Sequence, residues 1–372
     1  MEKLRVNDTP VRTARNFLIN NIEVELDIPE KIAEFKNVEI INDKSIIDNQ
    51  TSNKPLTYGN GKILEELNYE TANNKIRIQT NSKNENVKII YNFDDNNLNL
   101  INQIEIIANN DANVTIVYKS NTLNKCLHNG IIKTIVNENA KLNINIVNLL
   151  NEKSDNFEAM ENTLEANSKL KYTIIDIGGK TSVSNYYSNI IGENADNDLK
   201  SIYLGIDNQR KDINYIAELR GTKTNIDIDV QGVLQDSAKK NFKGTIDFKK
   251  GCKKAKGNEN EYCMLLSDKA KSIALPMLLC TEDNVEGNHS TASGKIDNNQ
   301  LFYIMSRGLS YKEAVKLIVK ANFNKIIERI TDEELKNEVL NEIDNKLNWK
   351  RKKVRKILTM RFGYGIIIQV FD

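Results

Sequence analysis

The stretch NENAKLNINI, residues 137–146, carries the pattern that decides the fold of this chain. Leu142, Ile144 and Ile146 alternate with asparagines, and alternation of apolar and polar residues is typical of a β-strand with one buried face. The polar residues and the alanine of NENA stand just before it, where a turn is expected. The stretch therefore predicts a short strand that begins directly after a corner.

The same arrangement returns along the middle of the chain. NNDANV, LEANSKL and GENADNDL also place an alanine shortly before a new alternating run, so four alanines lie 28, 26 and 29 residues apart: Ala112, Ala140, Ala166 and Ala195. Such a period, with strands and no helical pattern between, is typical of stacked coils around one continuous core. Asparagine suits the corners because it tolerates left-handed backbone geometry and its amides stack along the axis. We therefore expect a mainly β protein with a β-solenoid core, and a β-sandwich or jelly roll is the alternative.

The two ends of the chain differ from this middle part. Residues 1–85 are mixed α/β in pattern, and the solenoid is expected over 86–300. A helical region follows over 301–347, because the apolar period changes there. The basic tail, 348–372, contains the run WKRKKVRK and is expected to be a disordered, solvated segment.

Two helices are predicted in the helical region. Ser310 with Glu313, and Thr331 with Glu334, each fit a capping box at a helix start. The helices are expected to bury an apolar face each, made of Ala314, Leu317, Ile318 and Val319 in the first and Leu335, Val339, Leu340 and Ile343 in the second. Such a pair would cap the open end of the solenoid or dock another protein.

Composition excludes several classes of partner. The chain has 52 basic and 51 acidic residues, so its net charge of +1 gives no long-range attraction to nucleic acid or to an anionic membrane. No apolar run approaches the roughly 20 residues that span a bilayer, and the N-terminus lacks a signal-peptide apolar region. A cytoplasmic protein is expected.

The four cysteines show no CxxC pair and are expected to be reduced thiols. Cys252, Cys263, Cys280 and His289 have the ligand types of a zinc site, but their spacing matches no common zinc pattern.

Enzymatic motifs are weak. GGKTS, residues 178–182, lacks the first glycine of a phosphate loop because residue 174 is isoleucine, so no ATPase activity is expected. A solenoid that cleaves sugars would need paired carboxylates above a groove. Asp227, Asp229 and Asp247 fall on the outer face of predicted strands, and the chain has one tryptophan for stacking sugar rings. A carbohydrate-active solenoid and a self-associating structural solenoid are two functions that stay open at this point.

One histidine stands in an unusual setting. His289, one of two in the chain, lies in EGNHSTASGKID, residues 286–297, among small polar residues. Such an imidazole is not expected in a core, which favours a role in binding a metal or handling a proton. A catalytic pair with Cys280 would need hydrogen-bond geometry that the spacing does not fix.

Several motifs lie around His289 in a fixed order: KG at 250–251, LLSDKA at 265–270, the acidic DNV at 283–285, GKID at 294–297 and LFYIMSRGL at 301–309. In these motifs the chain resembles the SufB/SufD family, the scaffold subunits of the Suf machinery for iron–sulfur cluster assembly, and it is more like SufD. The motif residues include Asp268, Lys269, Pro276, Asp283, Gly294 and Asp297.

The resemblance implies a right-handed β-helix and a non-catalytic scaffold subunit. It implies edge-to-edge pairing with a SufB-like subunit or with a second copy, and docking of the SufC ABC-type ATPase on the helical region. Candidate docking residues there are Phe302, Tyr303, Arg307, Leu309 and Ala314. A cysteine desulfurase would be an indirect partner, as the source of sulfur.

The resemblance also implies a role for His289. By motif position it corresponds to the SufD histidine that faces a SufB cysteine and helps to hold the nascent cluster. Gly287 stands where the family motif has a cysteine, so thiolate ligands would have to come from the partner. No tightly bound cofactor is expected in the isolated chain, only a transient iron–sulfur cluster at the subunit interface.

Overall fold

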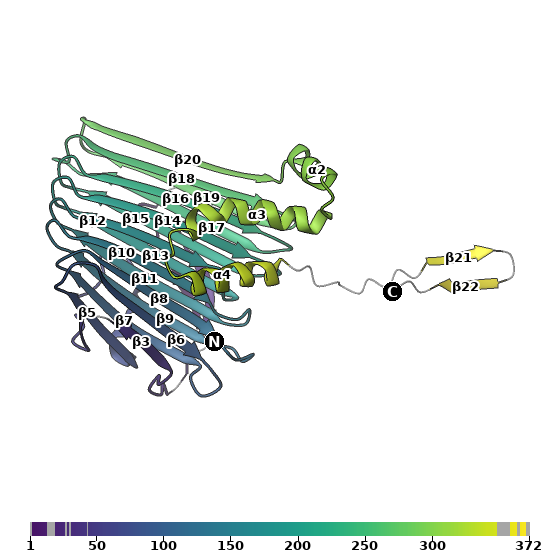
Figure 1. The fold of residues 1–372 in the computed structure, drawn as a ribbon, viewed down its shortest axis with the longest axis horizontal. Helices are drawn as coiled ribbons and strands as arrows, with labels where there is room; N and C mark the ends of the chain where they lie inside the picture. Colours follow the sequence, from purple (N-terminus) through teal and green to yellow (C-terminus); the bar gives the residue numbers. More distant parts are fainter. Residues whose placement is uncertain are drawn as a thin grey trace.

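The computed structural model describes residues 2–347, apart from 13–18, 27, 30 and 43, together with the backbone of 358–362 and 365–369. Its body consists of two sheets of nine strands each (Figure 1). Sheet I contains, in spatial order, β3 (Val38–Asn42), β6 (Glu85–Phe93), β8 (Ala112–Ser120), β10 (Lys141–Leu149), β12 (Lys169–Asp176), β14 (Asp196–Gly205), β16 (Asn225–Leu234), β18 (Ala255–Leu265) and β20 (Val285–Lys295). Sheet II contains β4 (Ile46–Asp48), β5 (Asn74–Thr80), β7 (Asn99–Ala108), β9 (Leu127–Val136), β11 (Asp155–Leu164), β13 (Thr181–Ile190), β15 (Arg210–Leu219), β17 (Lys239–Phe248) and β19 (Lys271–Cys280).

Strand pairing makes this body a solenoid. From β7 to β18, each strand pairs in parallel with the strands two before and two after it, so every coil gives one strand to each sheet. A β-sandwich would show antiparallel pairing of consecutive strands instead. The predicted β-solenoid core is therefore confirmed. The only antiparallel additions to the two sheets, within the described residues, are β3 on β6 and β4 on β5.

The register confirms the repeat and corrects its markers. Lys141 pairs with Lys169, and Lys169 pairs with Asp196, which aligns the preceding residues Ala140, Ser168 and Ala195 in one column. Ala166 precedes this column by two residues, and Ala112 follows it by two because it pairs with Leu142. The predicted period of 26–29 residues is therefore confirmed, but Ala112 and Ala166 do not occupy the position in the coil that Ala140 and Ala195 share.

The corners use the geometry that asparagine tolerates. A residue with positive φ directly precedes the small buried residue in successive coils: Asn139, Asn167, Asn194, Lys223 and Lys254. Asparagine amides also bond from coil to coil, as in the contacts from Asn109 to Asn81 (2.9 Å) and from Asn137 to Asn109 (2.6 Å). Both features were expected of asparagine-rich corners.

The core lies between the two sheets and is closed at one end. The inward residues of the predicted strands, including Val114, Ile144, Tyr172 and Ile228, are all buried there. At the N-terminal end Phe35 is buried against the rings of Tyr91 and Phe93, at centroid distances of 6.0 and 5.0 Å. Val38 of β3 and Ile47 of β4 pack against the same core, so this end is plugged.

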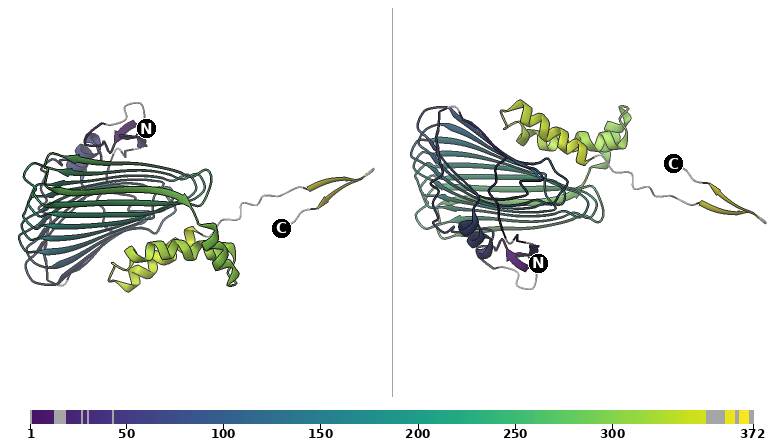
Figure 2. Two further views of the ribbon diagram at one scale, coloured as in Figure 1. Left: turned by 90° about the horizontal axis from the view of Figure 1, so that it is seen from above. Right: turned by 90° about the horizontal axis from the view of Figure 1, so that it is seen from below.

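The outer faces of the sheets carry separate layers (Figure 2). On sheet II lie β1 (Glu2–Val6), β2 (Ile22–Leu26) and α1 (Lys62–Thr71), which share an apolar cluster with Leu127, Phe157 and Val183. On sheet I lie α3 (Tyr311–Ile327) and α4 (Glu333–Lys346), whose apolar faces pack on Val117, Ile175 and Ile202 among others. The short α2 (Asn298–Ser306) leads from β20 to α3.

The two predicted helices form but do not cap the solenoid. They fold back across the face of sheet I, because Val117, Val147, Ile175 and Val233 give that face an apolar surface to cover. Helix α3 lies over β14 and β16, and α4 lies on the side of β8, where Glu338 pairs with Lys119. The capping box of Ser310 and Glu313 is present. The second predicted box is wrong, since Asp332 caps α4 and accepts from the backbone N–H of Leu335.

The predicted apolar faces of these helices are mostly confirmed. Leu317 is the exception, because it lies 49% exposed on the outer side of α3, and Leu340 is half-buried.

The C-terminal tail lies largely outside the described residues. Its basic run and the prediction of disorder over 348–372 fall there, while β21 (Leu358–Phe362) and β22 (Gly365–Gln369) pair antiparallel. None of the helices in the described part of the chain is both long and apolar enough to cross a bilayer.

Candidate functional site

His289 lies on β20, the last strand of sheet I, at the open end of the solenoid. Gly257 and Gly287 pair with each other and both face the core, where an added Cβ would meet Phe248. His289 follows Gly287 by two residues, and alternation therefore turns its imidazole toward the same inner side. The residue is nonetheless exposed, because no further coil of the described part of the chain covers the inner face of β20. The expectation that this histidine lies outside a packed core is confirmed.

Glu259 lies directly beneath His289 in the coil below. The two residues are register partners in the parallel pair of β18 and β20. Glu259 is fully buried, and neither oxygen of its carboxyl group has a hydrogen-bond partner. Burial and the neighbouring Glu261 raise the pKa of Glu259 to about 8, because the charged form is poorly solvated there.

A glycine makes room for this carboxyl group. Gly244 of β17 faces Glu259 from sheet II, and a Cβ at Gly244 would overlap the Glu259 carboxyl. The next residue along the same column of sheet II is Pro276, the register partner of Gly244. Neither position offers Glu259 a side-chain donor.

The neighbouring acid is paired. Glu261 accepts from Lys240 at 2.7 Å, in a salt bridge with both side chains buried, and from the hydroxyl of Tyr203 at 2.8 Å. Cys263, two residues further on the inner side of β18, is buried, and desolvation raises the pKa of its thiol. The open end therefore has a polar interior in which one carboxyl group has no hydrogen-bond or ion-pair partner.

The cysteines do not assemble a metal site. Cys126, Cys252 and Cys263 are buried, while Cys280, at the end of β19, is exposed and donates to the carbonyl of Glu282 at 3.0 Å. Within the described ranges, no group of three or more His, Cys, Asp and Glu side chains could hold a metal ion. The zinc alternative from Cys252, Cys263, Cys280 and His289 thus has no support in this geometry.

The edges of this end are long and have neighbours on one side only. β19 and β20 are 10 and 11 residues long, and each pairs with one strand. Ile273 on the outer side of β19 is 46% exposed. A long unpaired edge offers backbone donors and acceptors to another chain.

The candidate docking residues separate into two groups. Phe302 and Tyr303 of α2 are 75% and 58% exposed, and the guanidinium of Arg307 lies over the Tyr303 ring at 5.1 Å. Leu309 is half-buried. Ala314 lies on the buried face of α3, so its side chain is not available to a partner in this conformation, and its role in docking stays a prediction.

The other motif residues mainly shape the last coil. Asp268, in the corner before β19, bonds Lys295 at 2.7 Å, and Asp297 caps α2 by accepting from the backbone N–H of Asn299. Pro276 is half-buried on β19, while Lys269 and Asp283 are exposed in corners. Gly294 has open space around it. None of these residues touches His289 through an interaction that the structure shows.

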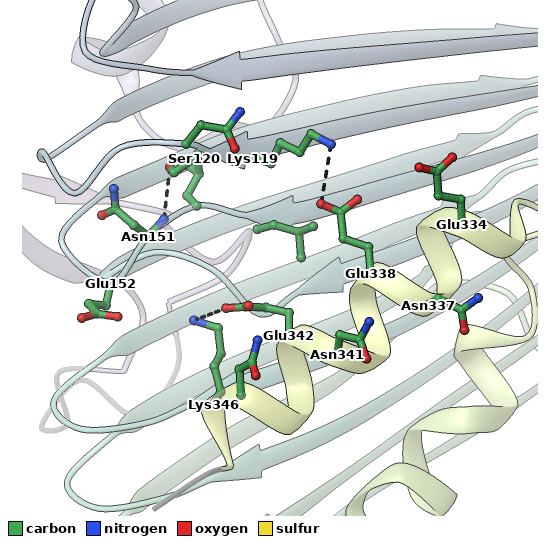
Figure 3. A pocket seen from close by; sticks show the side chains of 14 residues that line it. Lys119, Ser120, Asn151, Glu152, Glu334, Asn337, Glu338, Asn341, Glu342 and Lys346 are labelled. Atoms are coloured by element: carbon green, nitrogen blue, oxygen red, sulfur yellow. Dashed lines mark hydrogen bonds and ion pairs between the residues drawn. The ribbon is translucent and has the colours of Figure 1, made fainter. Parts of the chain in front are cut away.

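A groove lies elsewhere, between α4 and the corners after β8 and β10 (Figure 3). Glu338 faces Lys119 at 3.6 Å and Glu342 faces Lys346 at 3.3 Å, so these carboxylates are neutralised. Asn337 and Asn341 line the rest of the helix side. Two further carboxylates, Glu152 and Glu334, line the groove as well.

Comparison with known proteins identifies the family. The model for "SUF system FeS cluster assembly, SufBD core domain" matches residues 91–322, which is more than half of the 372-residue chain. The chain belongs to the SufBD family. The match covers the strands from β7 to β20 together with α2 and most of α3, so it includes the open end and His289.

Relatives of this SufBD chain include proteins named SufD. The iron–sulfur cluster assembly protein SufD of Bacillus subtilis is 26% identical over 265 residues, covering 70% of this chain and 61% of that protein. SufD of Plasmodium berghei is 26% identical over 335 residues, covering 80% and 24%. An iron–sulfur cluster assembly SufBD family protein of Pyrococcus horikoshii is 30% identical over 197 residues, covering 52% and 43%. The chain thus spans less than two thirds of these relatives, and the predicted family, most like SufD, is confirmed.

Sequence reasoning missed the residues beneath His289. Glu259, Gly244 and Lys240 were not considered there, because the carboxylates that were considered, Asp227, Asp229 and Asp247, were assigned to the outer face. The available signal was the phase of β18: Gly257, Glu259, Glu261 and Cys263 fall at every second position, and a buried cysteine among them points to the inner side.

Proposed function

We propose that this chain is a non-catalytic scaffold subunit for iron–sulfur cluster assembly that pairs with a second solenoid through the open end. The observation that carries the proposal is the open end itself: two long unpaired parallel edges flank an inner face on which His289 is exposed. Membership of the SufBD family supports it. The partner would be a SufB-like subunit, and pairing with a second copy is the alternative.

The assembling cluster is the cargo of this interface. His289 would supply a nitrogen ligand, and the thiolates would come from the partner, since Gly287 carries no thiol and Cys263 is buried. The sulfur would come from a cysteine desulfurase acting on the complex. No resident cofactor is required by this role.

The helical region would dock a SufC-like ABC-type ATPase through α2. Phe302 and Tyr303 present an exposed aromatic surface next to the open end. The packing of α3 on sheet I fixes α2 to the solenoid body, because Val315 and Ile318 share an apolar cluster with that sheet. ATP-driven movement of the ATPase would then be passed to the coils and would open the interface near His289.

Two measurements test this function. The chain is co-expressed with its SufB-like and SufC-like partners, the complex is purified, and cluster build-up is followed by absorbance with iron and a desulfurase. His289→Ala is expected to lower cluster yield while the complex stays intact, and an unchanged yield would contradict the ligand role. Phe302→Ala with Tyr303→Ala is expected to release the ATPase, whereas Leu317→Ala, an exposed apolar residue on α3, serves as the matched control.

A further inference from the structure

Two buried acids in the interior of the solenoid form ion pairs of the same kind. Asp176 of sheet I pairs with Lys211 of sheet II at 2.8 Å, and Glu261 of sheet I pairs with Lys240 of sheet II at 2.7 Å. All four side chains are at least nine-tenths buried. In both pairs an inward acid of sheet I is thus neutralised by a lysine that reaches across from sheet II.

Glu158, on the inner side of β11 in sheet II, is satisfied differently, through a hydrogen bond from the Tyr118 hydroxyl at 2.7 Å. Among the buried carboxyl groups of the described residues, Glu259 is the one with both oxygens unpartnered.

The position of Glu259 explains why no lysine of the described residues pairs with it. The facing residue of sheet II is Gly244, and the residue above that is Pro276. Only one coil, formed by β19 and β20, lies above Glu259. In that coil the register partner of Glu259 is His289. A lysine from the facing sheet of a further coil is absent because the solenoid ends. The missing counter-charge would therefore enter from the open end.

We propose that the partner subunit at the open end inserts a lysine or arginine side chain into the solenoid, where it pairs with Glu259. The inference rests on the proposed function, because it takes that subunit as the occupant. The inserted cation would complete the pattern of Asp176 with Lys211 and Glu261 with Lys240. It would also fix the register of the two subunits around His289, since a buried ion pair tolerates little misalignment.

The test uses Glu259→Gln, which keeps the shape of the side chain and removes its acid. In the isolated chain this change is expected to leave the fold intact and to stabilise it, because an uncompensated buried acid is removed. In the complex, the dissociation constant for the partner subunit is expected to rise at least tenfold, because the inserted cation loses its counter-charge. Opposite signs in the two measurements would not arise from a structural role alone. Glu158→Gln, deep in the same interior, is the matched control and should leave the dissociation constant unchanged.

Each other outcome decides the matter. An unchanged or lower dissociation constant for Glu259→Gln overturns the inference and leaves the scaffold role standing. Absence of any complex with the wild-type chain overturns both. A thermal stabilisation of the isolated wild-type chain by Co²⁺ that Glu259→Gln abolishes would show that a metal ion fills the position, and would also overturn the inference.

Discussion

At its N-terminal end the solenoid is closed by β3 and β4, whereas at its C-terminal end β19 and β20 have a neighbour on one side only. The closing strands are five and three residues long and antiparallel, and Phe35 plugs the core behind them. The open strands are 10 and 11 residues long, and the inner side of β20 is small and polar. Short edge strands and a filled core protect a fold from unwanted pairing with other chains. Long edge strands and an exposed inner face, as at the C-terminal end, are typical of an interface.

The first prediction compares the cores of the two ends. Phe35→Ala removes a buried ring that holds the closed end and should lower the free energy of unfolding by about 3–5 kcal/mol. Ile273→Ala at the open end should cost less than about 1 kcal/mol, because nearly half of that side chain is already exposed. Urea unfolding followed by circular dichroism measures both. Equal losses would remove the distinction between a closed and an open end.

The second prediction sharpens the open end by comparing two of its glycines. Gly244→Ala places a methyl group into the Glu259 carboxyl and should cost about 1–3 kcal/mol of stability. Gly294→Ala has open space around it and an ordinary backbone conformation, so its unfolding midpoint should stay close to that of the wild type. A neutral Gly244→Ala would show that Glu259 does not fill the space opposite that glycine.

The third prediction concerns pH and the buried acid of the open end. The pKa of Glu259 is raised from 4.5 in the unfolded chain to about 8, so the folded state holds a proton that the unfolded state releases. The stabilisation that Glu259 gives by holding this proton is fully present below pH 4.5 and is lost as pH rises toward about 8. Over this range the free energy of unfolding should fall by about 1.4 kcal/mol per pH unit.

Glu259→Gln should remove this slope from a series of urea unfolding curves measured between pH 5 and 8. Glu158, whose pKa burial also raises to about 8, adds a similar slope from the closed interior. Glu158→Gln should therefore remove a comparable part. A Glu259→Gln chain with the wild-type slope would mean that the carboxyl group is solvated or paired in solution.

The smallest expected effect is that of His289→Ala on the fold. The side chain is exposed at an open edge, so the free energy of unfolding should change by less than about 0.5 kcal/mol. A larger loss, measured by the same unfolding assay, would make His289 a structural residue of the last coil and would weaken its assignment as a ligand.

The sequence predicted the coils because their chemistry is local. Alternation in Leu142, Ile144 and Ile146, and asparagine at positive-φ corners such as Asn139, depend on neighbours within a few residues. The path of α3 and α4 was not predictable in this way. It depends on outward residues such as Val117 and Ile175, which look like breaks in the alternation until the facing helix is seen.

The candidate site was predicted only in part for the same reason. His289 could be found from its motif and its small polar surroundings. Glu259 and Gly244 come from different sheets and face each other only after the coil has closed. No pattern in the sequence indicates that these two residues are in contact. The unpaired carboxyl group of Glu259 could therefore be found only from the structure.

The most direct test of the central claim is hydrogen–deuterium exchange of the chain alone and in complex with its partner subunit. The account predicts that backbone amides of β19 and β20, residues 271–295, become protected in the complex, while those of β3 and β4, residues 38–48, exchange as before. Protection confined to β3 and β4, or no change at residues 271–295 in a complex that demonstrably forms, would contradict it.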